Sequence, residues 1–141
     1  MSKTLDQLIG QLIIAGFRSS WVSDRSNITR YIKEYNLSGV ILYDEDLEKN
    51  GLGTRNIKSP TQVKKLTDAL QSTSETPLFI SIDQEGGTVN RLKNNYGFPE
   101  FPSWKYIGAL DNTLITKEFA SSISDTMINT GINLNFAPVL D

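Results

Sequence analysis

Residues 78–83 read LFISID, a short apolar run that ends on a carboxylate. Three runs of the same kind occur elsewhere in the chain: LIIAGF at 12–17, GVILY at 39–43 and INLNF at 132–136. Each has the length of a strand, and the unbroken apolar runs at 12–17 and 39–43 are typical of strands buried on both faces. We therefore expect four strands.

Helical signals fill the segments between these strands. Thr4 and Gln7 fit a capping box before a short opening helix, and Ser26 is a candidate cap for the helix after the first strand. The segment SPTQ at 59–62 supplies a cap, a proline at the first helical position and a capping-box glutamine, and Gly131 fits a helix end. Apolar residues recur at helical spacing in each predicted helix: Leu5, Leu8 and Ile9; Ile28, Tyr31, Ile32 and Tyr35; Val63, Leu66 and Leu70; Leu114, Phe119, Ile123 and Met127.

The alternation of strands and helices predicts an α/β fold, because short apolar strands joined by helices pair in parallel with right-handed crossovers. Two architectures fit this pattern: an open doubly wound sheet, or half of a (β/α)8 TIM barrel, whose full length is typically ~250 residues. The 141-residue chain stops at Asp141, directly after the fourth strand. Four units in this length extrapolate to an eight-unit barrel. We therefore predict the amino-terminal half of such a barrel, with residues 1–141 as a partial domain truncated after the fourth strand.

Composition narrows the function classes. The chain has 14 Lys and Arg against 16 Asp and Glu, a net charge of −2, which offers no long-range attraction to nucleic acid or to an anionic membrane. It contains no Cys and no His, so any chemistry has to use carboxylates, hydroxyls, amides, Lys or Arg. The usual zinc ligands are therefore absent. Because the first residues lack the apolar run of a signal peptide and no membrane span is present, we expect a cytoplasmic protein.

The candidate site lies where the third strand ends, because ligands of parallel α/β folds collect at the carboxyl ends of the strands. There the sequence reads SIDQEGGTVNR over residues 81–91. Asp83 is a candidate ligand for two neighbouring sugar hydroxyls, and Arg91 is a candidate donor to the same ligand. A purely structural interpretation remains open, in which the diglycine of this segment makes a tight turn and Asp83 and Arg91 form an ion pair that holds the loop. Asp83 and Glu85 are not assigned as an acid/base pair, because glycosidase carboxylates flank the bond that is cleaved.

Further candidates lie near the ends of the chain's other elements. Trp104 either stacks on a sugar or packs with its aromatic neighbours as a cover for the barrel mouth. That predicted cover consists of Phe98, Phe101, Trp104 and Tyr106. Asn133 and Asn135 make one face of the fourth strand polar, so they are either hydrogen-bonded in the core or line the site. Asp141 falls at the equivalent upper end. Neither GxGxxG nor GxxxxGK[ST] occurs, which argues against phosphate binding.

Several of these segments, in this order, resemble the amino-terminal barrel of glycoside hydrolase family 3, in particular its β-N-acetylhexosaminidase-like branch. The most specific are IDQEGGTVNRL at 82–92 and GINLNFAPVLD at 131–141. Between them stand GFPEFPS at 97–103 and IGAL at 107–110, and GQLIIAGF and SGVILY extend the resemblance toward the amino terminus.

The resemblance implies a (β/α)8 barrel and retaining hydrolysis of a β-linked sugar, often terminal N-acetylglucosamine, through a covalent glycosyl-aspartate. It also implies that no metal and no organic cofactor is needed. The aspartate and the final arginine of the DQEGG motif correspond to Asp83 and Arg91, which are therefore expected to bind the substrate. The family's Lys-His pair, its Asp-His acid/base loop and its nucleophilic aspartate come after strand five and later. We expect no catalytic residue in this chain, and no glycosidase activity from the isolated chain.

Two other functions remain open. The chain could belong to a non-catalytic carbohydrate-binding or regulatory protein that keeps Asp83 and Arg91, or to an open-sheet α/β ligand-binding module. The free edge of the last strand of a half barrel also predicts self-association through that edge. The polar loop at 44–58 is longer than its counterpart in compact family members, so no preference for a leaving group is predicted.

Overall fold

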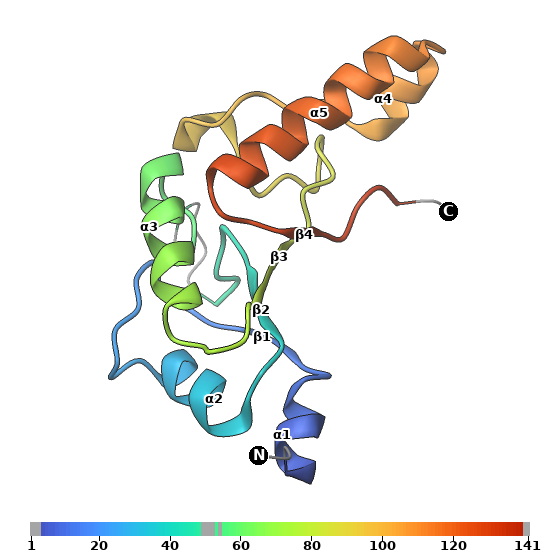
Figure 1. Ribbon diagram of the computed structural model, residues 1–141. Helices are drawn as coiled ribbons and strands as arrows, with labels where there is room; N and C mark the ends of the chain where they lie inside the picture. The colour runs from blue at the N-terminus through green and yellow to red at the C-terminus, as the bar shows by residue number, and fades with distance from the viewer. Residues whose placement is uncertain (1–3, 49–52, 54, 140–141) are drawn as a thin grey trace.

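A computed structural model describes residues 4–48, 53 and 55–139 of the chain. Four strands form one sheet in the order β1-β2-β3-β4, and in the view of Figure 1 the helices lie below, beside and above it. The elements are α1 (Leu5–Gly10), β1 (Ile14–Gly16), α2 (Asn27–Tyr35), β2 (Gly39–Leu42), α3 (Pro60–Gln71), β3 (Phe79–Ile82), the short 3-10 helix η1 (Asn94–Tyr96), α4 (Trp104–Ala109), α5 (Thr113–Asn129) and β4 (Leu134–Asn135).

All neighbouring strands are parallel, which confirms the α/β fold class. Gly39 is in register with Ile14 on one side and with Phe79 on the other, and Ser81 pairs with Leu134. Each strand lies beside the next strand of the chain. A doubly wound sheet reverses direction within its strand order, whereas a TIM barrel adds strands in sequence, so this order favours the half barrel.

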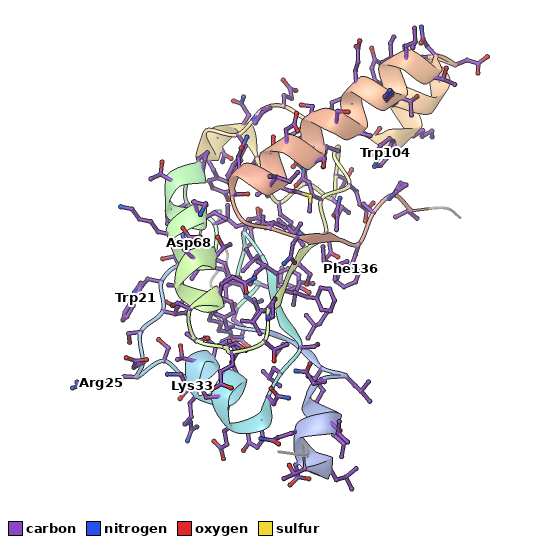
Figure 2. The ribbon with its side chains drawn as sticks, in the orientation of Figure 1. Trp21, Arg25, Lys33, Asp68, Trp104 and Phe136 are labelled. Atoms are coloured by element: carbon purple, nitrogen blue, oxygen red, sulfur yellow. The ribbon has the colours of Figure 1, made fainter. Side chains whose placement is uncertain are left out.

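The hydrophobic core lies between the sheet and the helices. Val40, Leu42, Ile80 and Ile82 alternate along β2 and β3 on the helix-facing side, and all four are 0% exposed. The other side of the sheet, which we call the inner face, has no helix over it (Figure 1). Its exposed aromatic residues are Phe79, at 52% exposure, and Phe136, at 47% and labelled in Figure 2.

The amino-terminal segment differs from the expectation of a fully buried strand. Within the predicted run 12–17 only Ile14–Gly16 forms strand β1, and Leu12 is 85% exposed. The reason is that β1 lies at an edge of the sheet and that its inner face is uncovered. Leu5, in the opening helix α1, is likewise 72% exposed.

Local capping follows the sequence at α1 and in part at α3, whereas Ser26 precedes α2 without a side-chain cap bond. The Thr4 hydroxyl accepts from the amide of Gln7 and the capping box is complete. At α3 the Ser59 side chain accepts from the backbone N–H of Gln62, as predicted. The Gln62 side chain, however, accepts from the N–H of Lys58 and not from that of Ser59, which corrects the second half of that capping box. Helix α4, with Ser103 as its cap, was not among the predicted helices.

Within the described part of the chain, no helix is both long and apolar enough to cross a membrane.

Candidate functional site

The DQEGG segment turns back on itself immediately after β3. Gly86 and Gly87 have φ values of +82° and +64°, and the N–H of Glu85 donates to the carbonyl of Val89 at 3.0 Å. A Cβ on Gly86 would lie 2.2 Å from the backbone oxygen of Pro102, so only glycine fits. The predicted tight turn is therefore confirmed, and it brings the return segment with Arg91 back toward β3.

The buried amide of Gln84 fixes this return segment. Its Oε1 accepts from the backbone N–H of Arg91 at 3.0 Å and from that of Leu92 at 2.9 Å, and its Nε2 donates to Asn90 Oδ1 at 2.7 Å. Gln84 is 0% exposed. The residue next to Asp83 thus holds the backbone of Arg91, which ties the positions of the two candidate ligands together.

Asp83 stands at the end of β3, on the inner-face side of the strand alternation, and is partly buried. Its carboxylate forms no hydrogen bond or ion pair with any residue that the structure describes. The acidic partner of Arg91 is Asp44, whose Oδ1 lies 3.6 Å from Arg91 Nη1. The interpretation of Asp83 and Arg91 as an ion pair that holds the loop is therefore wrong.

The Arg91 side chain is held by its neighbours but still has an N–H group available to a ligand. Its guanidinium carbon lies 5.6 Å from the centre of the Tyr43 ring, within the range of a cation–π contact. Its Nε is buried and has no hydrogen-bond partner among the described residues. A buried donor without a partner is costly unless a ligand or water satisfies it.

Asp44 is the centre of a charged cluster that the sequence analysis did not single out. It follows β2 directly, is 0% exposed, and pairs with Lys93 as well as with Arg91. Lys93 also pairs with Glu45. Asp44 could have been found from the sequence, because the carboxyl ends of adjacent parallel strands meet at one edge, and Asp44 and Asp83 are the first acids after their strands.

The charged cluster shifts the pKa values of Glu45, Lys93 and the neighbouring Tyr96. The hydrogen bond from Lys93 lowers the pKa of Glu45. Burial acts to lower the pKa of Lys93, but the hydrogen bonds to Asp44 and Glu45 outweigh it, and the net shift is upward. Burial and the charge of Asp44 raise the pKa of Tyr96. At neutral pH Glu45 and Lys93 therefore stay paired as ions.

A hollow of about 580 Å³ lies beside this cluster on the inner face. Tyr43 and Arg91 line it, together with Ile14, Gly16, Ile41, Glu45, Leu47 and Arg55. Arg55 lies across the Tyr43 ring at 4.7 Å and donates from Nε to the Phe17 carbonyl at 2.8 Å. The sequence did not point to Arg55 or Tyr43, since an arginine in a polar loop and a tyrosine at a strand end are both common on surfaces.

The remaining predicted residues serve the scaffold. Asn133 exchanges hydrogen bonds with the backbone of Ile80 and Leu78, and Asn135 with both backbone groups of Gln84. Of the two predictions for these amides, hydrogen bonding within the fold is the one observed.

The predicted aromatic cover is confirmed only in part. Trp104 lies edge-on to Phe119 of α5 at 4.8 Å, and Phe101 lies against the same ring at 6.2 Å. Phe98 is buried as well, but Tyr106 is 58% exposed and takes no part. Asp141 lies outside the described residues, as does part of the loop 44–58. Over residues 4–48 and 55–139, no three acidic side chains converge as metal ligands would.

The chain shares sequence and structure with known glycosidases. It is 31% identical to β-hexosaminidase A of Pseudoalteromonas piscicida, a match that covers 98% of this chain and 25% of that protein. The structure of a glycoside hydrolase family 3 β-N-acetylglucosaminidase from Paenibacillus sp. str. FPU-7 superposes with a TM-score of 0.83 at 37% identity, over 97% of this chain and 24% of the other. NagZ of Neisseria gonorrhoeae in complex with N-trifluoroacetyl-D-glucosamine has the same fold, with a TM-score of 0.75 at 22% identity over 92% of this chain and 36% of that one.

The chain thus spans about a quarter of the length of the first two of these proteins. The sequence model of the glycosyl hydrolase family 3 N terminal domain matches residues 4–141. The parallel strand order and the superposition agree with that match over nearly the whole chain. The chain therefore belongs to glycosyl hydrolase family 3, as part of the N-terminal, TIM-barrel-like domain of that family.

Proposed function

We propose that the protein carrying this chain hydrolyses terminal β-linked N-acetylhexosaminides with retention of configuration. In this proposal, residues 1–141 form its barrel as far as the fourth strand, and Asp83 and Arg91 bind the sugar. Support comes from the relatives, which are named as β-hexosaminidases and a β-N-acetylglucosaminidase, and from the NagZ structure that holds a glucosamine derivative.

The observation that carries the proposal is the unsatisfied polarity of the two residues. Asp83 has no protein partner among the described residues, and the Nε of Arg91 is buried without one. A carboxylate accepts hydrogen bonds from two adjacent hydroxyls, and a guanidinium donates to ring or hydroxyl oxygens, so each of the two groups has the chemistry to bind a pyranose. Gln84 holds them on one rigid turn, which favours binding without reorganisation.

Within this chain the proposed work is binding and orientation. Asp83 and Arg91 place the terminal sugar at the carboxyl ends of the strands, and we assign no nucleophile and no general acid/base to the described residues. Positioning of this kind contributes to catalysis because it holds the scissile bond in register with groups on other strands.

Kinetics of the intact protein on p-nitrophenyl N-acetyl-β-D-glucosaminide test the proposal. Asp83→Asn should lower kcat/KM by roughly 10- to 100-fold, the range for a lost hydrogen bond to a charged group. Asp68→Asn, on the exposed side of α3 (Figure 2), is the control and should leave kcat/KM unchanged. An unaltered Asp83→Asn enzyme would contradict the assigned site. Sugar binding by the intact protein without turnover would favour the non-catalytic alternative.

Self-association stays a prediction. In the described sheet, β1 and β4 each have one edge without a partner strand. If the isolated 141-residue chain sediments as a monomer at high concentration, self-association through these edges is contradicted.

A further inference from the structure

We propose that Asp44 is a positioning residue for Arg91, presented by the long connection between β2 and α3. The inference rests on the proposed function, since it matters only if Arg91 binds the sugar. It adds a residue outside the DQEGG segment to the binding site.

Hydrogen bonds hold the two ends of the connection from Asp44 to Arg55 together, beside the end of β2. The N–H of Asn56 donates to the Tyr43 carbonyl at 2.9 Å, the Tyr43 N–H donates to Asn56 Oδ1 at 2.9 Å, and the Arg55 N–H reaches the Asp44 carbonyl at 3.3 Å. Asn56 Nδ2 also donates to the carbonyl of Phe17, just beyond β1, at 3.2 Å. The position of Asp44 is therefore fixed by hydrogen bonds to the ends of β1 and β2.

The charges around Asp44 make Arg91 one of its two cationic partners. A carboxylate that is 0% exposed needs cationic partners, and Asp44 has two, Lys93 and Arg91. Lys93 is shared with Glu45, whereas Asp44 is the one acid in the described chain that pairs with Arg91. The pair joins Nη1 to Oδ1 at 3.6 Å without a hydrogen bond, so Arg91 is attracted into place while its Nε stays open for a ligand.

Two contacts thus set the Arg91 side chain. The Tyr43 ring lies 5.6 Å from the guanidinium carbon, and the Asp44 carboxylate lies at one terminal nitrogen. Both come from the end of β2, while the Arg91 backbone is held by Gln84 from β3. Without Asp44, a long flexible side chain would lose its charged anchor and sample more rotamers before binding.

Asp46 provides a matched control. Like Asp44 it is a nearly buried aspartate of the same connection, with its side chain 3% exposed, and it pairs with an arginine, Arg18, at 3.3 Å. Arg18 belongs to the segment after β1 and is 53% exposed. Loss of a buried carboxylate is therefore common to Asp44→Asn and Asp46→Asn, but only the first removes a contact to Arg91.

The experiment measures kcat and KM of the intact protein on p-nitrophenyl N-acetyl-β-D-glucosaminide. Asp44→Asn should raise KM by about five- to tenfold, the scale of a partly buried ion pair, with a smaller change in kcat. Asp46→Asn should leave KM unchanged. Asp44→Glu, which retains the charge, should recover part of the loss and serves as the test if Asp44→Asn does not fold.

The Arg91→Met background separates the two proposals. If Arg91→Met raises KM, Asp44→Asn should add little to it, because the contact is already gone. A KM that rises with Arg91→Met but not with Asp44→Asn would overturn the positioning role alone. A KM that is insensitive to Arg91→Met would overturn the proposed sugar site, and the positioning role with it.

Discussion

The two sides of β2 and β3 lie in very different surroundings. On the helix-facing side, Val40, Leu42, Ile80 and Ile82 are fully buried. On the inner face, Phe79 is half exposed, and the strand ends carry ionised groups and a hollow. The difference separates the part of the strand that holds the fold from the part that is free to bind.

Substitution at adjacent residues of β3 gives the largest expected contrast. Ile80→Ala should lower the free energy of unfolding by about 2–5 kcal/mol, because it leaves a cavity in a closed core. Phe79→Ala, one residue earlier, should cost less than about 1 kcal/mol, because more than half of that side chain is already exposed. Urea unfolding of the two variants of the isolated 141-residue chain provides the comparison. Equal losses would mean that the inner face is covered in solution, which would overturn the contrast.

The sequence predicted the helix-facing side well because burial there follows from periodicity. Apolar runs located β2 and β3 to within a residue, and Thr4 and Ser59 marked helix starts through side-chain caps that need no tertiary contact. The error at β1 has a physical cause, since an apolar run does not reveal whether a neighbouring strand and a cover exist. Leu12 is exposed for that reason.

The inner face was predictable only in part. Asp83, Arg91 and the diglycine turn were found because they are close in sequence. The partnership of Arg91 with Asp44 was missed, since 47 positions separate the two residues and neither position specifies the other's rotamer. The amide of Asn56 was missed for the same reason, because a lone asparagine in a polar loop carries no local signal of the three backbone groups that it meets.

Asn56 joins the chain just beyond β1 to the chain just beyond β2, and its substitution should give the next largest effect. Asn56→Asp keeps the acceptor for the Tyr43 N–H but replaces the donor to the carbonyls of Phe17 and Ser19 with a carboxylate oxygen. We expect a loss of about 2–4 kcal/mol in the free energy of unfolding, since a buried charge then faces two acceptors.

The same chemical change at Asn112 is the control. There only the side-chain oxygen is used, as it accepts from the N–H groups of Leu114 and Ile115 at the start of α5. Aspartate caps a helix as well as asparagine does, so Asn112→Asp should change stability by less than about 0.5 kcal/mol. A large loss there would mean that the effect at Asn56 reflects added charge and not lost donors.

The smallest expected effect is a pH dependence confined to the inner face. Lys93 lowers the pKa of Glu45 below its ordinary 4.5, so the pair stabilises the fold above that pH and is lost as the pH falls through the lowered pKa. Because Glu45 is a third exposed, Glu45→Gln should cost only a few tenths of a kcal/mol at pH 7. In acid the stabilities of the variant and the wild type should converge.

Urea midpoints at pH 7 and pH 3 provide the measurement. The reference is Glu100→Gln, since Glu100 is exposed and has no ion pair in the described chain. If Glu45→Gln and Glu100→Gln behave alike at both pH values, the Glu45–Lys93 pair contributes no stability, and Asp44 alone keeps that lysine in place.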